Sequence, residues 1–283
     1  MKPEDKKKLK LAAVDIRKGI MESTHAAKSG HPGGSLSAAD VIAYLYFHEM
    51  RIRPEEPDWE DRDRFVLSKG HAAPAVYAAL ALKGFFPMED LQTLRHIGSH
   101  LQGHPNMNLT KGIDMSTGSL GQGLSCAAGM AKGAKLRKKD INVYALCGDG
   151  EMDEGIIWEA VMFSAHYKLD NLCIMVDVNG LQIDGRTSDV MNTDPLDRKF
   201  EAFGCHVYHV EGHDFESLDG GFRHFHENHG SGKPTVLLMD TEKGKGIAYM
   251  ESEAGWHGKA PNDMQYKLAM AELEAHRMAL EVL

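Results

Sequence analysis

The sequence predicts an α/β fold, a doubly wound and mostly parallel sheet flanked by helices. Short apolar runs alternate with helical patterns, which is the arrangement of β-α-β units. The runs are continuously apolar, as strands covered on both faces are. Glycine-rich turns follow two of them. With 283 residues, the chain can form one large domain, and we expect residues 1–283 to do so.

The expected elements are defined by the period of their apolar residues. Strands are predicted at 142–147, 172–177, 206–210 and 235–240. Helices are predicted at 9–28, 38–48, 72–82, 123–137, 154–167, 215–227 and 263–283. Between them, the segments 50–61, 98–123 and 250–262 have no clear period and are predicted to be loops. Long loops in compact domains usually carry function.

Composition and charge exclude several classes of protein. A net charge of -9 argues against a nucleic-acid surface, which needs a basic patch. The longest apolar run, 41–47, is too short for a membrane span of about 20 residues. The N-terminus shows no apolar segment typical of a signal peptide, and the four cysteines include no C-x-x-C pair. We therefore expect a cytoplasmic protein without membrane or nucleic-acid partners.

The strongest local signal follows the first two predicted strands. Asp149 lies between Gly148 and Gly150, and 30 residues later Asn179 follows the next strand. Ligands of open α/β sheets bind beyond the carboxyl ends of the strands. The Asp149 carboxylate, the Asn179 amide oxygen and a backbone carbonyl near Leu181 are oxygens of the kind that Mg²⁺ prefers. The pattern predicts a metal and diphosphate site, whereas either turn alone is more typical of an ordinary loop.

These two segments, GDGEMDEG at 148–155 and DVNGLQIDG at 177–185, resemble the fingerprint of thiamine-diphosphate enzymes. The resemblance implies that Asp149, Asn179 and the carbonyl of Leu181 hold the metal. Mg²⁺ would be the usual ion, with Ca²⁺ or Mn²⁺ as possible substitutes. The resemblance also places Gly148, Gly150 and Glu151 beside the cofactor diphosphate. The second asparagine that is usual after Asn179 is Gly180 in this chain.

Five further segments narrow the resemblance to the transketolase family. They are SGHPGG at 29–34, SKGHA at 68–72, GHP at 103–105, GSLGQG at 118–123 and GWHGK at 255–259. Their order and spacing resemble the N-terminal, thiamine-diphosphate-binding region of transketolases, from about residue 10 to 265. A single segment of this kind is weakly specific, but the ordered set together with the metal motif is highly specific.

The resemblance also implies roles for these segments. His31 and His257 would lie over the substrate carbonyl and move protons, since imidazole titrates near neutral pH. His104 would hold the donor's terminal hydroxyl. His71 and His257 would reach the cofactor diphosphate.

Other expected contacts belong to the cofactor rings and to the subunit interface. Gly118, Ser119 and Leu120 would lie beside the rings, although many full-length members have proline where Ser119 stands. Glu154 would join a carboxylate network between two active sites. Lys243 is expected near the site.

A second group of histidines is large enough for a metal site, but its spacing does not suit one. The group is His213, His224, His226 and His229. The spacing 224, 226 and 229 does not put three histidines on one helix face, and no cysteine or aspartate completes a tetrahedral set. We interpret the group as a solvated helix end.

The transketolase family's full-length members continue for more than twice this length. Their pyrimidine-binding domain supplies the glutamate that activates the cofactor, and a C-terminal domain follows. Neither fits in 283 residues. We favour one subunit of a split transketolase over a truncated chain. This interpretation predicts a partner of roughly 300 residues with the glutamate and an assembly with two copies of each chain.

The expected reaction is transfer of a two-carbon ketol unit from a ketose phosphate to an aldose phosphate, with thiamine diphosphate. Sedoheptulose, fructose and xylulose phosphates, the sugars of the pentose phosphate pathway, are the default substrates, and a branched-sugar or sulfosugar ketose with the same two-carbon end is the alternative. One alternative is a subunit of another thiamine enzyme, such as a 2-oxo acid dehydrogenase first component or a 1-deoxyxylulose-5-phosphate synthase. Another is a catalytically silent cofactor-binding partner.

Overall fold

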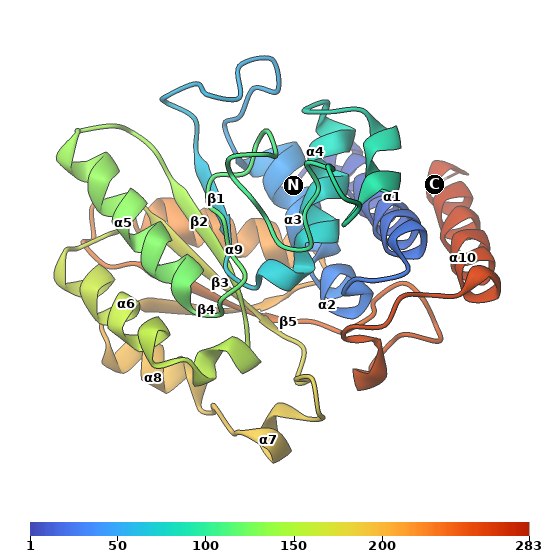
Figure 1. Ribbon diagram of the computed structural model, residues 1–283. Helices are drawn as coiled ribbons and strands as arrows, with labels where there is room; N and C mark the ends of the chain where they lie inside the picture. The colour runs from blue at the N-terminus through green and yellow to red at the C-terminus, as the bar shows by residue number, and fades with distance from the viewer. Residues whose placement is uncertain (283) are drawn as a thin grey trace.

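A computed structural model describes residues 1–282 and shows a central sheet between two layers of helices (Figure 1). Its strands are β1 Arg64–Leu67, β2 Val143–Gly148, β3 Leu172–Val178, β4 His206–Glu211 and β5 Thr235–Asp240. They pair in the order β1-β2-β3-β5-β4, and every pair is parallel. The predicted fold class is confirmed.

The helices divide between the two faces of the sheet. The α-helices are α1 Pro3–Ala27, α2 Pro32–Ser37, α3 Ala39–Tyr44, α4 Ala73–Lys83, α5 Gln122–Leu136, α6 Gly155–His166, α7 Thr187–Val190, α8 Leu196–Ala202, α9 Phe215–Glu227 and α10 Asp263–Val282. Leu283, the last residue of the predicted final helix, lies outside the described residues. Within residues 1–282, none of the helices has the length and apolar character needed for a membrane crossing.

The sheet separates two apolar cores because its side chains alternate. On β2, Tyr144 and Leu146 face the core beneath α1 to α4 and α9, whereas Val143, Ala145 and Cys147 face the core beneath α5, α6 and α8. The other central strands alternate in the same way. Burial on both faces explains why these strands appear as continuous apolar runs in the sequence.

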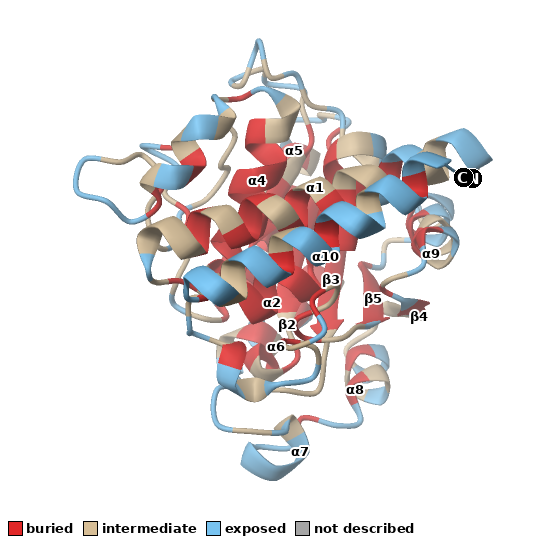
Figure 2. Ribbon diagram, turned by 90° about the vertical axis from the view of Figure 1, so that its right-hand side faces the viewer, coloured by how far each residue is buried: buried red, intermediate tan, exposed pale blue. Residues whose placement is uncertain are grey.

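Two helices show how the outer layer forms. Asp214 caps α9 by accepting a hydrogen bond from the Glu216 N–H, and the helix buries Leu218, Phe222 and Phe225 on one face. The C-terminal helix α10 lies along α1 and leaves its outer face exposed (Figure 2). Lys7 Nζ donates to the Glu281 carbonyl at 2.8 Å, so the beginning of α1 lies close to the end of α10.

Several elements differ from those predicted. The sequence did not reveal β1, which has four residues and begins with Arg64. It also missed α2, whose two glycines disfavour a helix, although all six of its residues are buried. The predicted helix 38–48 is α3 followed by a π-helical turn, Leu45–Glu49.

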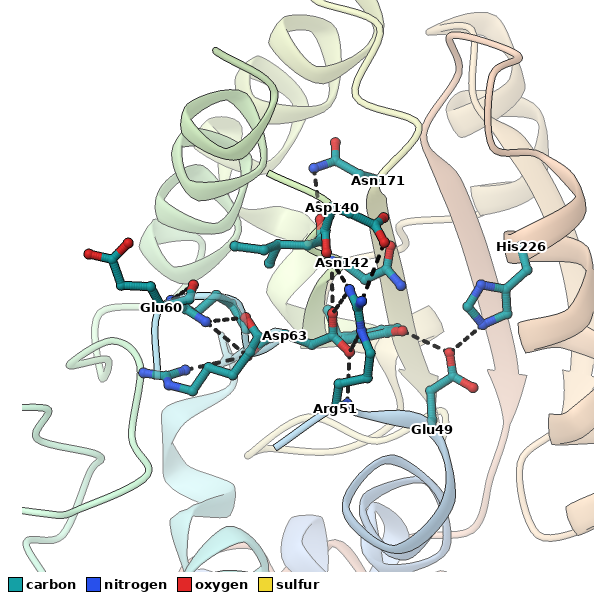
Figure 3. A network of polar contacts seen from close by, with 12 residues as sticks. Glu49, Arg51, Glu60, Asp63, Asp140, Asn142, Asn171 and His226 are labelled. Atoms are coloured by element: carbon teal, nitrogen blue, oxygen red, sulfur yellow. Dashed lines mark hydrogen bonds and ion pairs between the residues drawn. The ribbon is translucent and has the colours of Figure 1, made fainter. Parts of the chain in front are cut away.

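At the amino ends of the strands, a polar network links α9, β2 and the π-helical turn (Figure 3). Glu49 Oε1 accepts hydrogen bonds from Tyr144 Oη and from His226 Nε2, each at 2.7 Å. The bond to Glu49 raises the pKa of His226 against the effect of burial. His226 therefore has a carboxylate partner. His213 also has one, because it contacts Asp40 at 2.7 Å.

We predict that protonation of His226 strengthens its contact with Glu49 and so adds stability to the fold at low pH. Because folding raises the pKa of His226, this stability is complete below the unfolded value and is lost as pH rises through the folded one. Half-exposure and solvent screening limit the contribution to about 1 kcal/mol or less. The difference in urea-unfolding stability between wild type and His226→Gln should be largest near pH 5.5 and smallest above pH 8.

His209→Gln is the control, because the His209 side chain is 74% exposed and its nearest acid, Asp197, lies 4.0 Å away. A difference between wild type and His226→Gln that grows with pH would contradict the prediction.

Candidate functional site

Most residues of the candidate site lie in the segments that follow the carboxyl ends of four neighbouring strands. β1 leads into Lys69 and His71, β2 into Asp149, β3 into Asn179 and β5 into Lys243. These segments surround a pocket of about 310 Å³. It is lined by His31, Gly34, Lys69, His71, His104, Gly118, Leu120, Gly148, Asp149, Gly150, Glu151, Asn179, Leu181, Gln182, Ile183, Asp184, Lys243 and His257.

Of the residues proposed for the site from the sequence, all but Ser119 and Glu154 line this pocket. Ser119 is exposed between two lining residues. Glu154 is exposed at the N-cap of α6. The structure therefore gathers segments that are far apart in the sequence, and the assignment of a role to each residue remains a proposal.

A larger hollow of about 610 Å³ lies beside β4, β5 and α8. Asp194, Asp197, Glu211 and Asp240 are among its lining residues. An acidic lining of this kind repels phosphate groups, so the hollow does not suit a diphosphate.

The proposed metal ligands present oxygens of the right kind. Asp149 is 4% exposed, and its carboxylate accepts hydrogen bonds from the Gly150 N–H at 2.8 Å and the Gly180 N–H at 2.6 Å. Asn179 Oδ1 accepts from the Leu181 N–H at 3.1 Å. Burial, and then the nearby Asp177 carboxylate, raise the pKa of Asp149 to about 6. A buried carboxylate that is disfavoured as an anion fits a divalent cation, which would supply the missing positive charge.

Glu151 holds the loops of the pocket together. Its Oε1 accepts from Ser68 Oγ at 2.5 Å and from the Gly121 N–H at 2.8 Å, and its Oε2 accepts from the Gly148 N–H at 3.0 Å. The side chain therefore joins the segment after β1, the start of α5 and the end of β2. Both oxygens are used inside the protein.

Three histidines surround His31 and form a cluster of four with it. Its ring centre lies 5.5 Å from that of His71, 6.1 Å from that of His104 and 5.4 Å from that of His257. Burial lowers the pKa of all four rings, to about 4 for His31 and about 3 for His257. At neutral pH the rings are uncharged, so they can exchange hydrogen bonds with sugar hydroxyls without adding charge to the pocket.

Lys243 connects this cluster to the proposed metal ligands. Its Nζ lies 3.0 Å from His257 Nδ1 and donates to the Leu181 carbonyl at 3.3 Å. Burial and then the neighbouring Lys69 lower the pKa of Lys243 to about 8. These contacts place Lys243 in the wall of the pocket, and its part in an active site stays a proposal.

A buried ion pair beneath the pocket was not found from the sequence. Lys69 pairs with Asp177, and both side chains are almost fully buried. Lys69 Nζ also donates to the Gly34 carbonyl at 3.0 Å, and Asp177 accepts from Ser37 Oγ at 2.6 Å and from Thr241 Oγ1. Burial opposes ionisation of Asp177, but Lys69 and these donors keep its pKa below the usual value. An aspartate at the end of an apolar strand was the available signal, since buried charges need partners.

Together, the fold and the site define an α/β protein that can hold an anionic ligand and a divalent cation beside a group of neutral histidines. Comparison with known proteins identifies its family. Residues 9–278 match the family model described as transketolase, thiamine diphosphate binding domain.

Curated relatives include separately encoded subunits. The chain is 46% identical over 259 residues to a 6-deoxy-6-sulfo-D-fructose transketolase subunit of Clostridium sp., covering 92% of this chain and 94% of the relative. It is 43% identical to an apulose-4-phosphate transketolase subunit of Phocaeicola vulgatus, with 96% of each chain covered. Among solved structures, Campylobacter jejuni transketolase matches with a TM-score of 0.87 and 30% identity, covering 99% of this chain and 46% of that one.

The chain therefore belongs to the transketolase family. It is a transketolase subunit of the split type, the thiamine-diphosphate-binding N-terminal one, because it matches separately encoded subunits over nearly their whole length. The resemblance seen in the sequence is confirmed. The chain spans about half the length of the solved transketolases that it matches.

We predict that Lys69→Met destabilises the fold by about 3–5 kcal/mol, because Asp177 is left buried without a counter-ion. Urea unfolding measures the change. Lys69→Met combined with Asp177→Asn should recover part of the loss, since no unpaired charge remains. Lys111→Met is the control, because Lys111 is exposed. A loss below about 1 kcal/mol in the single variant would show that the pair does not hold this region.

Proposed function

We propose that the chain binds thiamine diphosphate through a divalent metal and, with a second chain, transfers a two-carbon ketol unit from a ketose phosphate to an aldose phosphate. The observation that carries the proposal is a single pocket that combines Asp149 and Asn179 with the four neutral histidines. The first group suits the metal-bound diphosphate and the second suits a polyhydroxylated substrate. Family membership supports the cofactor class.

In this proposal, the Asp149 carboxylate, the Asn179 amide oxygen and the Leu181 carbonyl hold Mg²⁺. The carbonyl would exchange its contact with Lys243 for the metal, which leaves the ammonium free to face the diphosphate. His71, His257 and the backbone at Gly148 and Gly150 contact the diphosphate. Glu151 holds the backbone at Gly148 in place through its three hydrogen bonds within the protein. Gly118, Ser119 and Leu120 lie beside the cofactor rings.

When bound, thiamine diphosphate would supply an electron sink for the negative charge that develops on the former carbonyl carbon as the neighbouring C–C bond breaks. The chain's own residues bind and orient the sugar. His31 and His257 form hydrogen bonds with the substrate carbonyl and its neighbouring hydroxyl. His104 forms a hydrogen bond with the terminal hydroxyl. Neutral imidazoles serve this purpose because they can both donate and accept hydrogen bonds.

A partner chain is needed to complete the site. Among the pocket-lining residues of the described chain, Glu151 is the single glutamate, and both of its oxygens are engaged within the protein. The glutamate that activates the aminopyrimidine ring would therefore come from another chain, with Glu154 near the interface. Exposed apolar residues on α5, on α6 and at the C-cap of α6 are a suitable contact surface; they are Leu136, Met162, Phe163 and Tyr167. We infer an assembly with two copies of each chain.

The most specific part of the proposal is the identity of the two sugar substrates. The names of two relatives specify a sulfonated fructose and a branched apulose phosphate. Both would fit the proposed pocket, because the histidines are assigned to the two-carbon ketol end, which these sugars share. We propose that the distal anionic group is recognised mainly by the partner, and that pentose-phosphate sugars, sulfosugars and apulose phosphate are the three classes to compare.

The chain, mixed with the product of the adjacent gene, should transfer ketol units only when Mg²⁺ and thiamine diphosphate are present. His257→Ala should lower kcat by about 100-fold, as expected for loss of an acid–base group, without preventing assembly on a sizing column. Cofactor-dependent pyruvate decarboxylation by the pair would instead indicate another thiamine enzyme. Cofactor binding without turnover of any ketose would indicate a silent partner.

Asp149→Ala should weaken Mg²⁺-dependent cofactor binding by more than about 100-fold, beyond the effect usual for residues outside the ligand set. Calorimetry with the assembled pair measures the affinity. Asp189→Ala on α7 is the matched control, because this exposed carboxylate lies in the loop after Leu181 but outside the pocket lining. Unchanged affinity in Asp149→Ala would refute the metal assignment.

A further inference from the structure

Arg95 lies beside the histidine cluster but has no place in the function proposed above. Its Nη1 donates to Ser29 Oγ at 3.2 Å, and its Nη2 lies 3.5 Å from the Gly103 carbonyl and 3.5 Å from His31 Nδ1. Ser29 precedes His31 by two residues, and Gly103 precedes His104 by one. One guanidinium thus connects the two loops that carry these histidines.

The backbone and the neighbouring glycine are both adapted to this position. Arg95 has a φ of 62°, a left-handed conformation that costs free energy for a residue with a Cβ and persists where the surroundings impose it. A Cβ at Gly103 would lie 2.9 Å from Arg95 Cζ, so glycine leaves the space that the guanidinium occupies. Within residues 1–282, none of the ion pairs includes Arg95. Its contacts are with neutral groups alone.

The chemistry of the two side chains restricts the proton on His31. Arginine has donors only and stays charged, so the nitrogen that it faces must present a lone pair. His31 Nδ1 is then unprotonated, and the ring proton is on Nε2. The Nε2 edge lies near Gly258, where the absence of a side chain keeps that edge open.

We propose that Arg95 is a positioning residue that fixes His31 as the neutral tautomer with its proton on Nε2, so that His31 donates a hydrogen bond in the pocket and does not act there as a base. The groups that face the ring agree with this state. Arg95, His104 and Lys243 all disfavour a charge on His31, and the rings of His71 and His257 lie on its other sides. The catalytic consequence rests on the proposed function, whereas the tautomer does not.

The tautomer can be tested on the chain without cofactor. Two-bond ¹⁵N–¹H spectra of ¹⁵N-histidine-labelled protein distinguish the two tautomers, and His31→Asn assigns the signal. In the wild type, the Nε2–H form should persist down to about pH 5, because the pKa of His31 is lowered to about 4. In Arg95→Ala, the signal should show mixed tautomers and a titration midpoint shifted toward 6.5.

Two further variants separate the contact from charge and folding. Gly103→Ala keeps the arginine but displaces its guanidinium, and it should change the His31 signal in the same direction as Arg95→Ala. Arg198→Ala on α8 removes an exposed arginine elsewhere and should leave the signal unchanged. A wild-type His31 with its proton on Nδ1, or an unchanged signal in both Arg95→Ala and Gly103→Ala, would overturn the proposal.

Activity with the partner gives the catalytic readout. Arg95→Ala should lower kcat about tenfold, a loss typical of a misplaced group, at unchanged cofactor affinity. Arg95→Lys should recover part of it. A wild-type pair without ketol transfer would contradict the proposed function, while the NMR result would still decide the role of Arg95. Wild-type kcat in Arg95→Ala would refute the catalytic consequence.

Discussion

The buried ion pair between Lys69 and Asp177 is the interaction on which the rest of the site depends. Asp177 accepts hydrogen bonds from α2 and from the segment after β5, and Lys69 adds a bond to the Gly34 carbonyl. Three segments thus converge on one carboxylate, which a fourth segment, β3, carries. The same segments carry His31, His71, Asn179 and Lys243, so the pair sets the positions of the histidines relative to the proposed metal ligands. A buried ion pair of this kind adds little to the net free energy of folding. Its effect here is to favour one relative position of the segments that meet at Asp177.

The central strands could be predicted because burial on both faces produces uninterrupted apolar runs, as in β2 and β3. Short elements could not. β1 has four residues and a charged start, and α2 contains two glycines, so neither carries a local pattern strong enough to recognise. Both form because the surrounding structure buries them. Tertiary burial there overrides local propensity, which is weak for such short segments.

The candidate site was predictable where its residues lie in motifs with a fixed order. Asp149, Asn179 and the four histidines were found in this way, and they line one pocket. Lys69, Asp177 and Arg95 were not found, because their roles come from partners far away in the sequence. Arg95 meets Ser29 across 66 residues, for example, and Lys69 meets Asp177 across 108. A single sequence can show that a buried aspartate such as Asp177 needs a partner, but it does not show which residue is that partner. Glu151 was found, but its work in holding three loops together became visible only from its contacts.

The cations around the pocket have a consequence for how ligands arrive. The chain as a whole carries a net charge of -9, and at long range it repels a phosphorylated molecule. Lys243 and Arg95 nevertheless lie beside the pocket, where the low-dielectric walls focus their field, whereas the charge of Lys69 is balanced by Asp177. Dissolved ions screen the scattered surface acids within about 8 Å at physiological ionic strength, and they screen buried charges much less. Salt therefore weakens the distant repulsion more than it weakens the field inside the pocket. There Lys243 and Arg95 attract an anion, whereas the buried Asp149 carboxylate would oppose it until a divalent cation neutralises that charge.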